Sequence, residues 1–401
     1  MNIRSVTCFV NAGTADAPPD TVRAAGQLAQ DVRTALQSAG FGVQTIRLAT
    51  QPLSLLPDAP LDVAASLWSQ CIEAGFDYLS LGPVLADTPG ADLSRMELIP
   101  ELIRVTETVF ASVLVGRFGQ GLHLEAIQRT GSLVREIAHS TDLGFGNLRL
   151  TMLANVGPHS PFFPAAYHDG RGAAVAIATE SADLAVAAFR GAKSLDEARA
   201  RLVAAVEAEA GAVVDLIGPL AAEHGFRFPG LDFSLAPFPE EARSIGTAVE
   251  SLGVDYFGAP GTLFVSSFLT DCLRQADYPR CGFNGLMLPV LEDAVLADRS
   301  RQGLFTINDL LLFSAVCGTG LDTVPLPGDV SEAELAGILL DVAALALRLD
   351  KPLTARLMPI PGAQAGDFTE FDFAYFSNGR VLDTKELGSP GLFRRGPWLA
   401  T

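Results

Sequence analysis

The sequence predicts a large α/β protein in which strands and helices alternate. Short β-branched or apolar runs are separated by longer helical patterns along almost the whole chain, which is typical of successive parallel β-α units. Apolar residues make up 49% of the 401 residues, and charged residues make up 18%. That charged fraction is below the roughly 25% of average soluble domains, which favours one thick body with many buried helices. Because no Gly/Ser-rich linker divides the chain, we expect a single domain, residues 1–401.

Ten segments have the composition expected of strands, namely 3–10, 42–48, 77–82, 109–115, 148–156, 174–179, 229–235, 285–289, 354–359 and 371–377. Ten strands that alternate with helices are compatible with an open doubly wound sheet or with a closed barrel. The pattern alone does not choose between these two architectures.

The starts of several helices carry side-chain capping patterns, in which a hydroxyl and an acidic group satisfy each other's free backbone donors. The pairs are Ser194 with Glu197, Ser331 with Glu334 and, as a weaker version, Thr306 with Asp309. The helix that begins near Thr306 is expected to end at Gly318. The apolar stretch 335–349 is too short for the roughly 20 residues of a bilayer span, so it predicts a buried helix.

Composition also limits the partners. The net charge is −18, from 28 basic and 46 acidic residues without a basic cluster, so we expect no nucleic-acid partner. Five cysteines without CxxC spacing indicate neither a disulfide framework nor a zinc knuckle and favour a reducing compartment. The first residues enter a strand without a secretory leader. We therefore expect a soluble, cytoplasmic homo-oligomer that binds a small molecule and no membrane.

The densest polar cluster is the segment 155–168, which directly follows the strongest predicted strand. It includes Asn155, His159 and His168 and lies where α/β proteins keep their sites, at the carboxyl end of a strand. Its prolines restrict the loop, and a general acid or base needs such fixed placement. The alternative is a rigid surface loop that covers Phe162 and Phe163.

A second segment, 282–299, runs from a glycine-flanked Asn284 into an apolar strand and then a helix. Asn284 suits close approach of the backbone to a ligand, and it suits a tight turn equally well. Glu292 and Asp293 are expected in the first turns of the helix, where the helix dipole alone favours acidic residues. They are also candidate ligands of a divalent metal ion.

A third segment, 314–323, contains Cys317 and Asp322 in a glycine-rich loop. Cys317 is a candidate nucleophile, although a helix C-terminus disfavours a thiolate. Further candidates for binding substrate are Ser234 after a strand, Gly261 and Thr262 at the start of a helix, and Arg356 in an apolar strand. Arg356 is costly to bury unpaired, so it predicts either a structural ion pair or an anion anchor.

Several common chemistries have no support in the sequence. It contains neither a Walker motif nor a strand-borne GxGxxG, so no nucleotide cofactor is indicated. HExxH and GxSxG are absent as well, which removes the zincin and α/β-hydrolase interpretations. A Mg²⁺ or Ca²⁺ site made of scattered carboxylates remains open.

Segments 154–168, 282–293 and 315–323 resemble the domain-of-unknown-function 711 family, also named uncharacterised protein family 0210, and 257–262 and 356–359 extend the resemblance. The resemblance implies a fold similar to the pyruvate formate-lyase-like glycyl radical enzymes, a ten-stranded α/β barrel of two antiparallel halves with five parallel strands each. Those enzymes carry a C-terminal Arg-Val-x-Gly motif. Here Arg380-Val-Leu-Asp383 puts Asp in place of the radical glycine, so no radical chemistry is expected.

Together these features predict an enzyme that acts on a small polar metabolite in a barrel mouth by acid/base or thiol chemistry. The residues expected to converge there are His159, His168, Asn155, Asn284, Cys317 and Asp322. One alternative is a hydrolase or lyase that uses Mg²⁺ or Ca²⁺ on Glu292, Asp293 and Asp322. Another is a non-catalytic ligand-binding or regulatory protein, since a fold does not fix a function.

Overall fold

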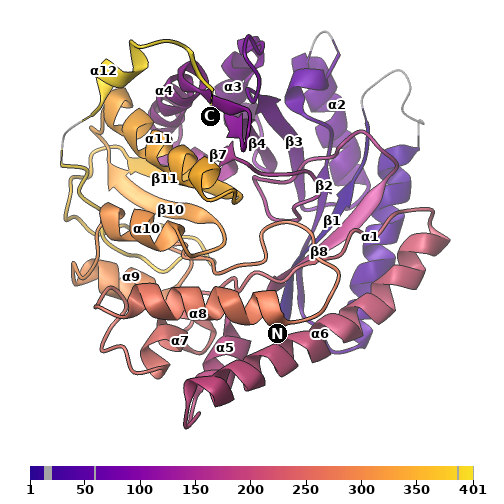
Figure 1. The fold of residues 1–401 in the computed structure, drawn as a ribbon. Helices are drawn as coiled ribbons and strands as arrows, with labels where there is room; N and C mark the ends of the chain where they lie inside the picture. The colour runs from indigo at the N-terminus through magenta and orange to yellow at the C-terminus, as the bar shows by residue number, and fades with distance from the viewer. Residues whose placement is uncertain (13–19, 58–59, 386–387, 401) are drawn as a thin grey trace.

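The centre of the computed structural model, which describes residues 1–12, 20–57, 60–385 and 388–400, is a nine-stranded sheet surrounded by helices (Figure 1). The strand order is β10-β11-β7-β4-β3-β2-β1-β8-β9. The strands are β1 (Asn2–Phe9), β2 (Val43–Ala49), β3 (Tyr78–Leu85), β4 (Val109–Leu114), β7 (Leu150–Ala154), β8 (Ala174–Glu180), β9 (Leu231–Asp232), β10 (Gly320–Pro327) and β11 (Leu353–Ile360). A separate small sheet contains β5 (Gly116–Arg117), β6 (Gly121–His123) and β12 (Trp398–Leu399).

The large sheet consists of two groups of strands that run in opposite directions. Strands β1, β2, β3, β4 and β7 form one group and are parallel to one another. This group meets the other group at two antiparallel pairs, β1 with β8 and β7 with β11. Strands β8 and β9 are parallel, as are β10 and β11. Isolated parallel bridges join Leu231 to Arg280, Leu235 to Leu286 and Pro289 to Asp322. Both edges of the sheet therefore bridge to the segment 280–289.

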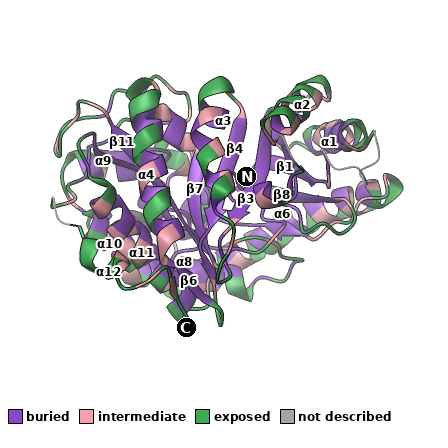
Figure 2. Ribbon diagram, turned by 90° about the horizontal axis from the view of Figure 1, so that it is seen from above, coloured by how far each residue is buried: buried purple, intermediate pink, exposed green. Residues whose placement is uncertain are grey.

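The helices cover the outer face of the sheet, and their exposed sides form much of the molecular surface (Figure 2). They are α1 (Thr21–Ser38), α2 (Pro60–Glu73), α3 (Ile99–Val105), α4 (Leu124–Ser140), α5 (Ala182–Phe189), α6 (Leu195–Glu223), α7 (Ile245–Ser251), α8 (Thr262–Gln275), α9 (Ala294–Arg301), α10 (Ile307–Ser314), α11 (Glu332–Arg348) and α12 (Pro390–Phe393). No helix of the described ranges is long and apolar enough to cross a membrane.

The inner face of the sheet carries small polar side chains instead of a second layer of helices. On β1, Ser5 and Thr7 both donate hydrogen bonds to the carbonyl of Pro161, at 3.0 and 2.9 Å. On β3, Ser80 donates to the carbonyl of Ala166 at 2.8 Å. The loop between β7 and β8 is therefore held against the inner face by hydroxyl groups, which satisfy backbone carbonyls that would otherwise be buried unpaired.

Most of the predicted elements are present. Seven predicted strands match β1, β2, β3, β4, β7, β8 and β11, and the buried helix over 335–349 is confirmed as α11. The capping boxes at Ser331 and Thr306 are confirmed. At α6 the box differs, because the Glu197 carboxylate accepts from the N–H of Lys193.

Five segments differ from the predictions. The strand predicted at 371–377 is wrong, because this segment is a loop whose backbone binds the side chain of Asn378. Conversely, β10 occupies part of the segment that was predicted as a glycine-rich loop, and α10 ends at Ser314, four residues before Gly318. The segment 229–235 contains only the short β9, and 285–289 makes only isolated bridges.

The contact between Gly285 and Gly318 provides a test of the packing between the segment 280–289 and the approach to β10. A Cβ atom on Gly318 would lie 2.4 Å from the Gly285 Cα. Gly318→Ala should therefore lower the free energy of unfolding by about 2–4 kcal/mol in a denaturant titration. Gly337→Ala, in α11, is the matched control, because among the described residues outside the helix the nearest atoms to an added Cβ would be those of Ser389, at 4.0 Å. It should raise the free energy of unfolding by about 0.5–1 kcal/mol. Equal effects of the two variants would contradict the close approach.

Candidate functional site

A cavity with about 930 Å³ of empty space, including its opening to solvent, lies on the inner face of the sheet. Its walls come from β1, β2, β3, β4, β7, β10 and β11 and from the loops around residues 162–165, 283–292 and 373–375. The polar lining residues are Arg4, Gln44, Thr45, Arg47, Tyr78, Thr151, Glu292, Thr319, Asp322, Thr354, Arg356 and Tyr375. Phenylalanines are prominent among the remaining lining residues, so a ligand there would meet both polar groups and aromatic surface.

Arg356 lies at the centre of a buried ionic network in this cavity. Its guanidinium binds Asp322 Oδ1 at 2.6 Å and Glu292 Oε1 at 2.7 Å, and it donates to the carbonyl of Leu148 at 3.3 Å. The other oxygen of Glu292 binds Arg4. Of the two alternatives that the sequence left open for Arg356, the observed contacts are those of a buried ion pair, in which hydrogen bonds offset the cost of desolvation.

The network continues from Arg4 to the end of β8, in the second strand group. Arg4 also binds Glu180 at 3.1 Å, and Glu180 binds Arg243. The charges therefore alternate from Arg243 to Asp322. At the far end, Asp322 uses only Oδ1, and its Oδ2 makes no hydrogen bond within the described ranges. Burial raises the pKa of Asp322, although Arg356 acts in the opposite direction.

Arg47 differs from Arg4 and Arg356, the other arginines of the cavity lining, because no carboxylate of the described residues forms an ion pair with it. It is only 8% exposed, its Nε donates to the Thr45 hydroxyl at 2.8 Å, and its terminal nitrogens make no hydrogen bond in the described part of the chain. The guanidinium carbon lies 5.5 Å from the ring centre of Tyr78 and 5.2 Å from that of Phe163. Burial and the charge of Arg4 lower the pKa of Arg47 to about 10, so it remains a cation at neutral pH.

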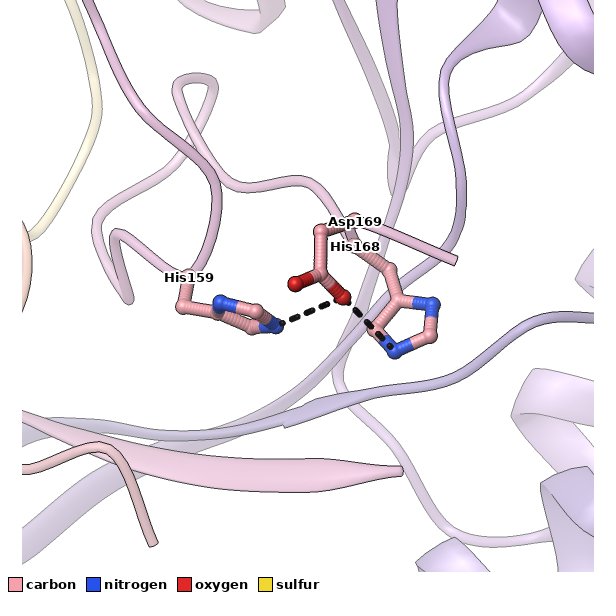
Figure 3. Close-up of side chains that lie close together, drawn as sticks. All are labelled: His159, His168 and Asp169. Carbon is pink, nitrogen blue, oxygen red and sulfur yellow. Dashed lines mark ion pairs between the residues drawn. The ribbon is translucent and has the colours of Figure 1, made fainter. Parts of the chain in front are cut away.

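The predicted histidines lie together in a second cluster, at the ends of the β7–β8 loop (Figure 3). Asp169 Oδ1 lies between them, 3.5 Å from His159 Nε2 and 3.7 Å from His168 Nε2. Arg227 approaches the same oxygen at 3.6 Å. The loop is bonded to β2 here, because the N–H of His168 donates to the carbonyl of Thr50.

This cluster has the contacts of a hydrogen-bonded structural group. The ligating atoms of His159, His168 and Asp169 lie within 4.8 Å of one another, which would suit a metal ion. However, His168 Nδ1 accepts from the N–H of Gly170, so its Nε2 carries the proton that the carbonyl of Arg171 accepts at 3.0 Å. Both nitrogens of His168 are therefore occupied, and Arg227 already supplies positive charge to Asp169.

Asp232 organises the turn that contains Asn284. Its carboxylate accepts from the N–H groups of Phe283 and Asn284 and from the Ser234 hydroxyl, at 2.6–2.9 Å. Asn284 has a positive φ of 50°, and its side-chain oxygen accepts from Phe233 and Tyr278. The amide of Asn284 and the hydroxyl of Ser234 are thus engaged within the turn and are absent from the cavity lining.

Glu292 and Asp293 have different partners despite being adjacent. Both were expected in the first turns of a helix, but Asp293 is the N-cap of α9 and Glu292 precedes it. Glu292 lines the cavity, whereas Asp293 does not. The fully buried Asp293 carboxylate also accepts from the hydroxyl of Ser244 and the N–H of Ile245, and burial raises its pKa. These contacts tie α9 to α7 and point Asp293 away from the partners of Glu292.

Four further candidates also lie outside the cavity lining. Cys317 is fully buried, with Sγ 3.4 Å from the N–H of Gly320. Gly261 is the N-cap of α8, and the Thr262 hydroxyl is engaged with the backbone of the preceding loop. Asn155 binds Asp350 and the N–H of Phe118. The six residues expected to converge are therefore divided among several places, and only Asp322 reaches the cavity.

Comparison with known proteins identifies the family. A family model described as "Uncharacterised ACR (DUF711)" matches residues 1–377. The chain belongs to the DUF711 family. It is similar to the UPF0210 proteins of Pyrobaculum arsenaticum (32% identical, with 95% of this chain and 89% of the relative aligned), Methanopyrus kandleri (31%, 93% and 86%) and Clostridium perfringens (28%, 82% and 77%). These names indicate no activity, so a function has to be argued from the site of this DUF711 protein.

Sequence reasoning missed Arg4 and Arg47 in this DUF711 cavity, although a signal for Arg47 was available. Arg47 lies in the run Ile-Arg-Leu-Ala of a predicted strand, the same pattern that singled out Arg356. A charged residue inside an apolar strand needs a partner or a ligand, and this argument applies to both positions. The sequence does not show that Arg356 has two carboxylate partners while Arg47 has none in the described ranges.

The histidine cluster predicts a pH dependence of stability. Burial lowers the pKa of His159 from 6.5 to about 4, against the attraction of Asp169. As the pH falls, His159 of the unfolded chain is protonated near pH 6.5, whereas His159 of the folded chain is protonated only near pH 4. The free energy of unfolding should therefore decrease between these pH values, by up to about 3 kcal/mol. His159→Asn, whose side chain tolerates the positive φ at this position, should lose less stability over that interval. Denaturant titrations from pH 7.5 to 4.5 measure the difference. The exposed His139→Gln serves as control, and a parallel decline of wild type and His159→Asn would contradict the assignment.

Proposed function

We propose that this protein is an enzyme that acts on a small organic anion, which Arg47 binds inside the cavity. The observation that carries the proposal is a buried guanidinium that faces an open cavity without a carboxylate partner in the described ranges. Burying an unpaired charge destabilises a protein, and an anionic ligand would supply the missing partner. Its terminal N–H donors suit a carboxylate or a phosphate.

Asp322 is the proposed proton acceptor. Arg356 fixes one of its oxygens, and the other has no hydrogen-bond partner in the described ranges and lines the cavity with the rest of the residue. A raised pKa brings a carboxylate closer to the range in which it exchanges protons at neutral pH. In the proposed step an H–O or H–C bond of the ligand breaks, its electron pair stays on the ligand, and the proton forms an O–H bond with Oδ2.

We also propose that the segment 280–289 acts as a tenth strand that closes the sheet into a barrel. Its isolated bridges to β9 and β10 support this closure, as does the antiparallel orientation of the two strand groups. Five strands would then run in each direction, which is the pyruvate formate-lyase-like arrangement. The site within it would work without a glycyl radical, because Asp383 stands where the radical glycine would be.

Two buried arginines of the cavity allow a matched test of this proposal. Arg356→Met leaves Glu292 and Asp322 short of a partner, so the free energy of unfolding should fall by about 3–5 kcal/mol. Arg47→Met removes a cation that has no carboxylate partner in the described ranges, so stability should be unchanged or should rise by about 1 kcal/mol. Denaturant titrations without added ligand compare the two variants. A loss at Arg47 as large as that at Arg356 would show that Arg47 is a structural cation.

The activity is tested with a cell metabolite extract analysed by mass spectrometry. Wild type should consume at least one organic anion, whereas Arg47→Met and Asp322→Asn should leave it unchanged. His159→Asn, outside the cavity, is the control and should retain activity. Retention of an anion without consumption would instead indicate a binding protein, a reading favoured by the pairing of Glu292 with two arginines. Loss of activity only in His159→Asn would move the site to the histidine cluster.

A further inference from the structure

Besides Arg47 and Asp322, the cavity contains another polar group that lacks a hydrogen-bond partner among the described residues. Thr319 is 3% exposed and lines the cavity, and its hydroxyl oxygen has no hydrogen-bond partner among the described residues. Its backbone is fixed, because the carbonyl accepts from both the N–H and the hydroxyl of Thr354, at 2.7 and 3.0 Å. A buried hydroxyl that lacks a partner costs free energy, so this position needs a hydrogen-bonding group of the ligand.

Thr319 and Arg47 lie on opposite strand groups. Arg47 is on β2, in the middle of the sheet order, whereas Thr319 directly precedes β10 at an edge of that order. Asp322 lies on β10, three residues after Thr319. A ligand that satisfies both unpartnered groups would therefore have its anionic group at one end and a hydrogen-bonding group at the other.

The charges of the lining residues limit the ligand to a single negative charge. Arg4, Arg47 and Arg356 contribute three positive charges, and Glu292 and Asp322 contribute two negative charges, which leaves one positive charge in excess. Glu180 and Arg243, which extend the network outside the lining, cancel each other. One carboxylate neutralises the excess, whereas a phosphate dianion would leave a negative charge in a buried site.

Apolar side chains also line the cavity. Phe163, Phe283 and Met287 line the cavity, and Met287 and Phe163 are buried. An apolar middle in the ligand would bury its surface against these side chains, and it would not need further hydrogen bonds.

From these observations we infer that the cavity binds hydroxy monocarboxylates, with the carboxylate on Arg47, an apolar middle, and a hydroxyl that contacts Thr319 and the free oxygen of Asp322. The hydroxyl donates to Asp322 Oδ2 and accepts from the Thr319 hydroxyl, which satisfies both groups with one ligand atom. This inference rests on the proposed role of Arg47 and adds the class of substrate to it.

Calorimetric titrations test it with ω-hydroxy acids from 4-hydroxybutanoate to 8-hydroxyoctanoate, each paired with the alkanoate of the same length. At the best length, the hydroxy acid should bind wild type about ten-fold more tightly than its alkanoate. Thr319→Val, which has the same shape without the hydroxyl, should reduce that difference to about two-fold or less and leave the alkanoate affinity unchanged. The matched control is Thr179→Val, a buried threonine outside the lining, which should behave as wild type.

The outcomes separate the two proposals. Failure of every carboxylate to bind wild type, or equal binding by Arg47→Met, would overturn the anion site and with it the inference. Carboxylate binding that depends on Arg47 but not on the ligand hydroxyl or on Thr319 would overturn only the substrate class. Inorganic phosphate that binds more tightly than every monocarboxylate would also overturn the substrate class, while Arg47 would remain the anion site.

Discussion

The alternating row of charges from Arg243 through Glu180, Arg4, Glu292 and Arg356 to Asp322 is the interaction on which the site depends. It joins β1, from one strand group, to β8, β10 and β11 of the other. Each interior member has a partner on both sides, so the desolvation of one charge is offset by two neighbours. A row of this kind fixes the relative positions of strands that no short turn connects, and the cavity takes its shape from them.

Arg47 stands apart from this row of paired charges. It lies within this polar region, yet the row ends at Asp322 without including it. Its hydrogen-bond and ring contacts in the described ranges are a hydroxyl and two aromatic rings, and Glu292 and Asp77 act on its charge without forming an ion pair with it. If Arg47 had only a structural role, a buried carboxylate would be the expected neighbour. The cavity therefore combines a network of paired charges with groups that lack partners in the described ranges, and such a division is what the proposed ligand site would require.

Much of the fold could be predicted because strands such as β4, β7, β8 and β11 are buried at every residue, and strands buried on both faces are nearly continuous apolar runs. The prediction failed at 371–377, where Phe371, Phe373 and Phe376 pack on Phe145 as part of a loop. Aromatic enrichment is common to strands and to such loops, so composition could not separate them. The strand β10 was missed for the opposite reason, because its first residues, Gly320 to Thr323, have the small and polar composition of a loop.

The candidate site was predictable only in parts. Glu292, Asp322 and Arg356 were each singled out for a local reason, as a helix start, a loop and a strand. They meet because β10 pairs with β11 and because Pro289 bridges to Asp322, and nothing local in the sequence encodes these pairings. His159 and His168 were singled out for their density near prolines, and the structure places them outside the cavity, where His168 bonds to the backbone and both histidines approach Asp169. The proposed function rests instead on polar groups that lack partners in the described ranges, and no local sequence pattern separates such groups from paired ones.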